Sequence, residues 1–134
     1  MKSLILIITC ITIVFVVDGC KKNRSTERIG MVHIENSIIP DTVLTNEIAY
    51  ISIKASETNG CWSALFVDIE KEDMYEYSIK AYGTFSCFEG GCACPEVMVY
   101  HDTIIDFQPK QKGTFLFRIQ KNRNNIITDT LIVK

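Results

Sequence analysis

Apolar and polar residues alternate along most of the chain after residue 28, with the period of two that is typical of strands. Between residues 75 and 81, for example, Tyr75, Tyr77, Ile79 and Ala81 share one face of an extended segment. No segment in this part of the chain carries apolar residues at helical spacing. The pattern predicts strands at residues 48–54, 62–69, 75–81, 97–100, 103–107, 114–119 and 126–133.

Turn-forming residues separate the predicted strands at intervals of about ten to twenty residues. Glu89-Gly90-Gly91 is a clear example, and Pro109 and Gly113 bracket a bend that should lead into a core strand at 114–119. About seven short strands, each with one buried face, need two sheets that cover each other. We therefore expect an all-β fold, a β-sandwich that occupies residues 29–134.

The N-terminal segment has a different pattern. Fourteen residues, Leu4 to Val17, carry no charge and follow the single base Lys2, which is typical of the apolar region of a signal peptide. A membrane-spanning helix needs about 20 apolar residues, so this run is too short to remain as an anchor. The stretch Val16-Val17-Asp18-Gly19-Cys20 resembles a bacterial lipobox. This resemblance implies a lipoprotein signal peptide at residues 1–19 and a lipidated Cys20 as the mature N-terminus.

A lipidated cysteine would carry diacylglycerol, whose two chains hold a protein stably at a membrane. Residues 21–28 contain no aliphatic or aromatic side chain before Ile29, so we expect residues 20–28 to be a flexible tether. Lys21 does not match an acidic surface-export signal. The expected location is the cell envelope, with the lipid anchor in the outer membrane and the body facing the periplasm.

Composition and charge exclude several functions. The chain has 134 residues, which leaves room for one domain and rules out a multidomain enzyme. Fourteen Lys and Arg against sixteen Asp and Glu give a net charge of -2, which does not favour a nucleic-acid partner. The two histidines lie in no catalytic motif, and no phosphate-binding loop or GxSxG sequence is present. We expect a protein that is not an enzyme and that needs no cofactor.

Four cysteines lie in the predicted body: Cys61, Cys87, Cys92 and Cys94. In an oxidising compartment an even number of cysteines indicates disulfides. Cys92 and Cys94 are two residues apart in an extended chain and share a face, so a bond between them would be strained. Of the two remaining pairings we prefer Cys61–Cys94 with Cys87–Cys92, because the Gly-rich tip between Cys87 and Cys92 can bring them together.

Two other interpretations of this region stay open. Cys87, Cys92 and Cys94, with Met98 or His101, offer soft ligands that suit copper or zinc. The neighbouring aromatic residues are a candidate binding patch at one end of the sandwich, although aromatic residues of β domains are usually part of the core. This patch would contain Trp62, Tyr82, Phe85 and Phe88.

Several short sequences resemble known patterns. Asp41-Thr42-Val43, Asp102-Thr103-Ile104 and Asp129-Thr130-Leu131 each resemble the acceptor for O-glycosylation in Bacteroidota. Longer stretches resemble a group of small Bacteroidota lipoproteins with immunoglobulin-like sandwiches, a group with no established activity to transfer. These stretches are Asn59-Gly60-Cys61-Trp62, Tyr77 to Gly83, Cys94-Pro95, and Pro109 with Gly113-Thr114-Phe115 and Phe117.

The resemblance implies an immunoglobulin-like β-sandwich of about seven strands. Our functional hypothesis is a membrane-anchored envelope lipoprotein that binds a protein or a glycan through loops at one end of the sandwich. The alternatives are a structural or accessory envelope lipoprotein and a soft-metal binding protein.

Overall fold

The computed structural model describes residues 25–88 and 91–134. The predicted signal peptide, the lipidation site Cys20 and residues 20–24 of the predicted tether lie outside these residues. The described residues contain strands and no helix, which confirms the all-β expectation. In chain order the strands are β1 (Ser25–Met31), β2 (His33–Ile38), β3 (Thr42–Val43), β4 (Ala49–Glu57), β5 (Trp62–Lys71), β6 (Glu76–Phe88), β7 (Val99–Phe107), β8 (Gly113–Asn122) and β9 (Asn125–Val133).

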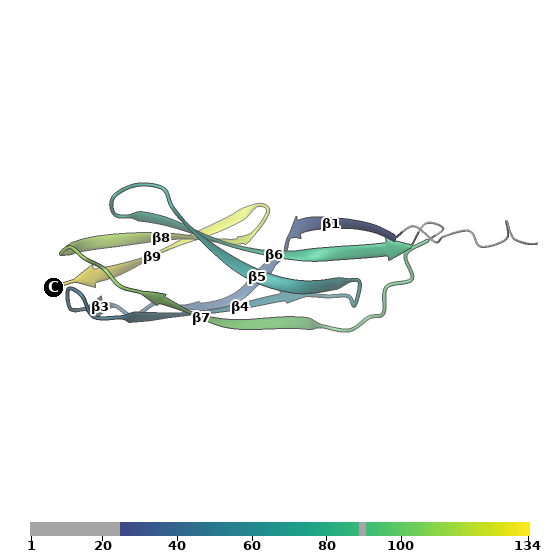
Figure 1. Cartoon of the computed structure of the whole chain (residues 1–134), viewed down its shortest axis with the longest axis horizontal. Coiled ribbons are helices and arrows are strands. Elements are labelled where there is room, and N and C mark those ends of the chain that lie inside the picture. The colour runs from purple at the N-terminus through teal and green to yellow at the C-terminus, as the bar shows by residue number, and fades with distance from the viewer. Residues whose placement is uncertain (1–24, 89–90) are drawn as a thin grey trace, which may run out of the picture.

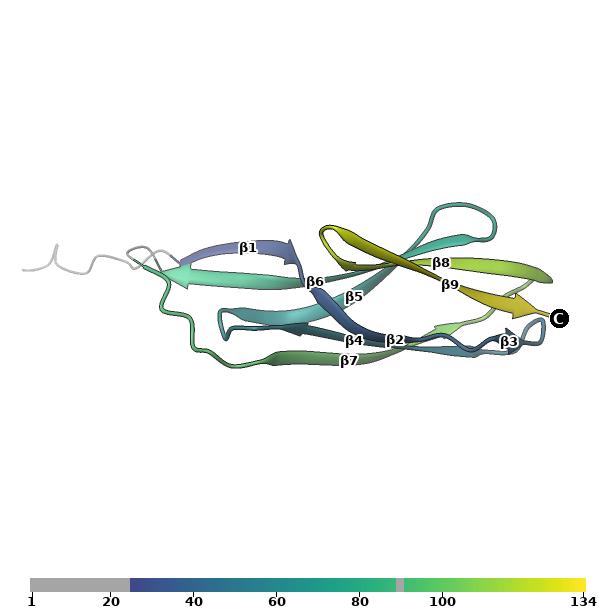
Figure 2. The ribbon, with the colours of Figure 1, turned by 180° about the vertical axis from the view of Figure 1, so that it is seen from behind.

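The strands form two sheets that pack face to face as a β-sandwich (Figures 1 and 2). One sheet has the order β2-β4-β7, with antiparallel neighbours. In the other sheet the long strand β6 pairs with β5 along one edge and with both β1 and β8 along its other edge. β8 then pairs with β9, and β9 with the short β3. The chain passes from one sheet to the other at Val32, between β1 and β2.

The core lies between the two sheets and follows the predicted alternation. Ile79 and Ala81 on β6 are fully buried, and Phe117 and Ile119 on β8 are buried beside them. The facing sheet contributes its own buried side chains, which include Ile34, Ile51 and Ile53. Burying a side chain of this size stabilises the fold by about 1.5–3 kcal/mol. The strand at 114–119 is a core strand, as its position after the Pro109–Gly113 bend predicted.

The N-terminal part of the sandwich differs from the expectation. Residues 25–28, assigned to the flexible tether, form the first half of β1 and pair in register with β6, from Ser25 opposite Phe88 to Met31 opposite Tyr82. The assignment was wrong because the backbone hydrogen bonds of a strand edge do not require apolar side chains. β2 and β3 also lie outside the predicted strand list, whereas two predicted strands are combined in β7 (Val99–Phe107), and the described residues therefore contain nine strands and not about seven.

The two strands expected at 97–100 and 103–107 are a single strand, β7. His101 and Asp102 continue the alternation and pair with Ala55 and Lys54 of β4, so no turn interrupts the chain there. Val97 and Met98 precede the strand and are exposed.

The sandwich is elongated, and its two ends carry different parts of the chain (Figure 1). β1 begins and β6 ends at one end, and the four cysteines lie in or near the segments that meet there. The C-terminus, the β5–β6 turn and the β7–β8 connection lie at the other end. From Tyr77 to Phe88 the strand β6 advances eleven residues, or about 36 Å at about 3.3 Å per residue.

Candidate functional site

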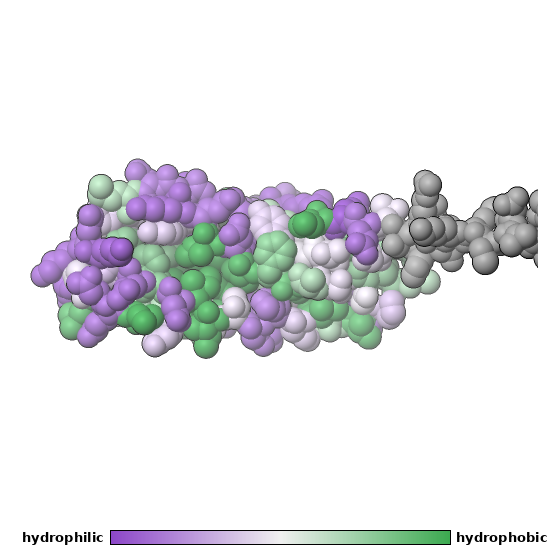
Figure 3. Space-filling model, viewed as in Figure 1, coloured by the Kyte–Doolittle hydropathy of each residue, from purple (hydrophilic) through white to green (hydrophobic). Residues whose placement is uncertain are grey.

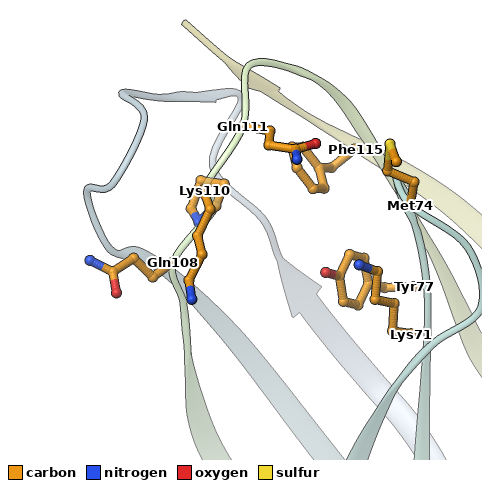
Figure 4. A pocket seen from close by; sticks show the side chains of 8 residues that line it. Lys71, Met74, Tyr77, Gln108, Lys110, Gln111 and Phe115 are labelled. Carbon is orange, nitrogen blue, oxygen red and sulfur yellow. The ribbon is translucent and has the colours of Figure 1, made fainter.

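A cavity of about 320 Å³ opens at the end where the C-terminus lies. One wall is the end of β5, the β5–β6 turn and the start of β6, and the opposite wall is the connection from β7 to β8 (Figure 4). Its volume is at the lower end of the range for ligand sites, about 300–1,000 Å³. The lining residues are Lys71, Met74, Tyr77, Gln108, Pro109, Lys110, Gln111 and Phe115.

Aromatic rings form the base of this cavity. Tyr77 stacks on Phe117 with ring centroids 5.6 Å apart and meets Phe107 edge to face at 5.1 Å. Phe115 in turn meets Phe107 at 5.4 Å and Tyr75 at 5.1 Å, both edge to face. Because these rings pack on one another in favourable geometries, the base is rigid.

The Tyr77 side chain also supplies a polar group to the cavity. Its hydroxyl points into the open space between the two walls (Figure 4). Within the described part of the chain this hydroxyl makes no hydrogen bond. The Tyr77 ring packs on three phenylalanines, Phe107, Phe115 and Phe117. Its unpaired hydroxyl is therefore held in position for a ligand that enters the cavity.

Hydrogen bonds hold the two loops that form the walls. In the β5–β6 turn, the backbone N–H groups of Glu72 and Asp73 donate to the carbonyl of Glu76, at 2.9 Å and 3.2 Å. On the opposite wall, Gln108 Nε2 donates to the Asn46 carbonyl at 2.7 Å, and the Asn46 N–H donates to the Pro109 carbonyl at 2.9 Å. The cavity is thus shaped before a ligand arrives.

Gly113 ends the β7–β8 connection in a conformation that favours glycine, with φ of 146°. A β-carbon at this position would lie 2.9 Å from Cε1 of Tyr75. The Tyr75 hydroxyl lies 3.5 Å from Gln111 Oε1 and 3.4 Å from the Lys112 carbonyl, as a donor to either. Glycine at 113 therefore lets the connection lie close over Tyr75.

The charged residues that line the cavity in the described part of the chain are both basic, Lys71 and Lys110. The acidic Glu72 and Asp73 lie in the adjoining β5–β6 turn, outside the lining. Neither lysine forms an ion pair with another described residue. Nearby Glu76 forms one with Arg118, with Oε2 2.9 Å from Nη2 of the arginine. On the face in Figure 3, apolar surface gathers left of the middle, with hydrophilic surface above it and at the left end.

The opposite end of the sandwich contains both disulfides. Cys61 is bonded to Cys94 and Cys87 to Cys92, with Cα–Cα distances of 5.2 Å and 5.3 Å. This is the preferred pairing, so that prediction is confirmed. A second cavity of about 280 Å³ lies beside them and is lined by residues that include Ser63, Ser86 and Pro95.

The aromatic residues proposed as a patch do not form one surface. Tyr82 and Phe85 are three positions apart on a regularly paired part of β6, so their side chains point to opposite faces. Phe85 packs edge to face on Trp62 at 5.3 Å, whereas Tyr82 stacks on the exposed Phe66 at 5.6 Å. The side chain of Phe88 lies outside the described set. The prediction of a joint patch that includes Tyr82 and Phe85 was wrong because their spacing is odd.

Trp62 belongs to the packing of the fold. Its indole ring lies against Gly30 and Gly83, two positions where a β-carbon would come within 3.3 Å of the ring. The ring also packs on the buried core. Arg28 on β1 pairs with Phe85 of β6, and its guanidinium carbon lies 4.9 Å from the centre of the Phe85 ring.

The three cysteines proposed as soft-metal ligands, Cys87, Cys92 and Cys94, are all bonded in disulfides. Among residues 25–88 and 91–134 no group of three or more His, Cys, Asp or Glu is arranged to hold a metal ion. Of the three Asp-Thr sequences, Thr42 and Thr130 are exposed, and Thr103 is half-buried in β7 opposite Ile53.

Comparison of the chain with protein-family models, with curated proteins and with solved structures finds no match in any of the three. Within its described part, no helix has the length and apolar character that crossing a bilayer requires. The interpretation of the site therefore depends on its geometry and chemistry.

Proposed function

We propose that this protein is a lipid-anchored binding module of the bacterial cell envelope, which presents the cavity between β5–β6 and β7–β8 to a protein or glycan ligand. The single observation that carries the proposal is the position of the cavity, which lies at the end of the sandwich opposite the start of β1. The lipobox-like sequence that ends at Cys20 supplies the anchor in this proposal.

The geometry of the chain supports this arrangement. Five peptide units separate Cys20 from Ser25, and they span at most about 17 Å. A lipidated Cys20 would therefore keep the disulfide-bearing end close to the membrane. The cavity would stand on the order of 36 Å farther out, which is the length of β6 from Phe88 to the cavity residue Tyr77. Such an arrangement lets an anchored receptor reach a ligand that is not in its own membrane.

The two disulfides fit the same proposal. Disulfides are expected in an exported domain, because they form and persist in an oxidising compartment. They lie at the end that would adjoin the membrane and leave the loops of the cavity free of cysteines. We include in this proposal the oxidising periplasmic location, the outer-membrane anchor and the immunoglobulin-like character of the sandwich.

The anchor is tested with a Cys20→Ser variant of the full chain, expressed in its own host. We expect this variant to lose incorporation of labelled palmitate and to move from the membrane fraction to the soluble fraction. Cys10→Ser is the matched control and should keep both properties. Membrane retention of the Cys20→Ser protein would contradict the proposal of a lipid anchor.

The binding role is tested by crosslinking in intact cells. Lys110→Glu changes a lining residue, and Lys112→Glu changes the same charge on the same connection outside the lining. We expect a crosslinked species that forms with the wild type and with Lys112→Glu but not with Lys110→Glu. The alternative, a structural or accessory lipoprotein, predicts that the two variants give the same crosslinks.

A further inference from the structure

The polar groups of the cavity are mostly hydrogen-bond donors. Lys71 and Lys110 extend from opposite walls, and the Tyr77 hydroxyl points into the space between them (Figure 4). Oε1 of Gln111 accepts a hydrogen bond from the Tyr75 hydroxyl, and Nε2 of Gln111 donates to no other described residue. With two ammonium groups, a phenol, an amide N–H and no lining carboxylate, the cavity fits an anionic ligand.

These donors are available without rearrangement. Neither lysine has an ion-pair partner among the described residues, so a ligand carboxylate does not have to displace an internal one. The β7–β8 connection carries both Lys110 and Gln111. Hydrogen bonds of its Gln108 side chain and its Pro109 carbonyl to the backbone of Asn46, at 2.7 Å and 2.9 Å, hold this connection in place. The backbone of this connection is therefore ordered before a ligand binds, which lowers the entropic cost of binding.

The shape of the cavity indicates what carries the anionic group. Its volume of about 320 Å³ suits a ring-sized unit, and its base combines the Tyr77 and Phe115 rings with the half-exposed Met74. A sugar ring has an apolar C–H face that packs on such a base and hydroxyl groups that bond to Tyr77 and Gln111. An aspartate or glutamate side chain is thin and would leave the aromatic base uncovered.

We infer that the cavity binds a sugar residue that carries a carboxylate, such as a uronic acid at the end of a glycan. In this arrangement the carboxylate lies between Lys71 and Lys110, and the ring lies over Tyr77. The inference rests on the proposed function, because it names the ligand class of the same cavity.

The test measures the affinity of the full-length acylated protein, in detergent micelles, for two matched glycans by calorimetry. One glycan ends in glucuronic acid, and the other is the same molecule with that carboxylate reduced to a primary alcohol. We expect the acidic glycan to bind about tenfold or more tightly than the reduced one, because charge-assisted hydrogen bonds are lost. A polyglutamate peptide is the third probe and should bind more weakly than the acidic glycan.

Variants then locate the binding. Lys71→Gln and Lys110→Gln should each weaken binding of the acidic glycan by about tenfold and leave binding of the reduced glycan unchanged. Lys112→Gln, outside the lining, should change neither affinity. Unchanged thermal unfolding of all three variants shows that the fold is intact, since these side chains lie on exposed segments.

Three results would overturn the inference: equal affinity for the two glycans, no binding of either glycan, or tighter binding of the peptide. The crosslinking experiment distinguishes these results from failure of the proposed function. A crosslink that depends on Lys110 but is not accompanied by glucuronate binding means a binding module with another ligand class. If neither a Lys110-dependent crosslink nor glucuronate binding is observed, the cavity is not a binding site.

Discussion

The indole ring of Trp62 lies so close to Gly30 that a β-carbon on Gly30 would stand 2.8 Å from Cη2 of the ring. Gly30 is on β1 and Trp62 is the first residue of β5, and both strands pair with β6. The indole ring thus occupies the space that a side chain at position 30 of β1 would fill. This contact joins the N-terminal strand to the end of the sandwich that contains the disulfides.

Gly30→Ala should lower the free energy of unfolding by about 1–3 kcal/mol, because the added methyl group overpacks the space that the Trp62 ring fills. Urea unfolding followed by circular dichroism measures the change. The control is Gly30→Ala combined with Trp62→Leu, compared with Trp62→Leu alone. If Gly30→Ala lowers the free energy of unfolding as much in the Trp62→Leu background as in the wild type, the contact with the indole ring is not the cause.

Removal of the disulfides should have unequal effects. The Cys61–Cys94 bond closes 33 residues and the Cys87–Cys92 bond closes 5. The chain-entropy relation predicts that paired substitution to alanine lowers the free energy of unfolding by about 3–4 kcal/mol for the long link and about 2 kcal/mol for the short one. Urea titration of the two double variants measures both. The reverse order would contradict the entropic explanation.

Ser78 has a buried hydroxyl without a hydrogen-bond partner in the described part of the chain. Leaving such a group buried and unpaired is costly, so Ser78→Ala should raise the free energy of unfolding by about 1 kcal/mol. Ser52→Ala on an exposed position of β4 is the matched control and should change stability by less than about 0.5 kcal/mol. Destabilisation by Ser78→Ala would mean that the hydroxyl is satisfied, for example by water.

Phe85 and Tyr82 should respond differently to truncation. Phe85 packs on Trp62 from the inner side of β6, so Phe85→Ala should cost about 2 kcal/mol of stability. Tyr82 stacks on Phe66, which is exposed, so Tyr82→Ala should cost less than about 1 kcal/mol. Thermal and urea unfolding compare the two variants. Equal losses would place both rings in the same environment, against the alternation of β6.

The ion pair between Lys80 and Glu70, 2.8 Å apart, should make stability depend on alkaline pH. The hydrogen bond to Glu70 raises the pKa of Lys80 above its usual value of 10.5, against the opposing effect of desolvation. A raised pKa means that the stabilisation is fully present below pH 10.5 and is lost as the pH rises through the higher pKa of the folded state. The stability difference between the wild type and Lys80→Met should therefore shrink above pH 10.5. A difference that does not change with pH in this range would contradict the assignment.

Part of the candidate site follows from the sequence. Alternation placed Tyr75 and Tyr77 on the buried face of a strand, and the Pro109–Gly113 bend was expected to lead into a core strand. Both elements contribute to the cavity. Tyrosine in place of phenylalanine at position 77 was the available signal for a polar function, because a mostly buried tyrosine keeps a hydroxyl that needs a partner.

The location of the binding surface was not predictable in this way. The sequence drew attention to the aromatic residues near the cysteines, and there Tyr82 and Phe85 point to opposite faces. Lys71 and Lys110 are 39 positions apart in the chain, and nothing local indicates that they line one cavity. They meet because the β5–β6 turn and the β7–β8 connection reach the same end of the sandwich.

Side-chain period, turn residues and the number and spacing of the cysteines were sufficient for the all-β fold, most of its core strands and the preferred disulfide pairing. These properties depend on neighbouring residues or on a pairing with few alternatives. The tertiary structure decided that β1 pairs with β6 from Ser25 onward, that β6 lies between β5 and β8, and that the two lysines share a cavity. The backbone of an open strand edge can pair with many segments, so only the simultaneous packing of both sheets selects the partners and the end of the molecule where the loops meet.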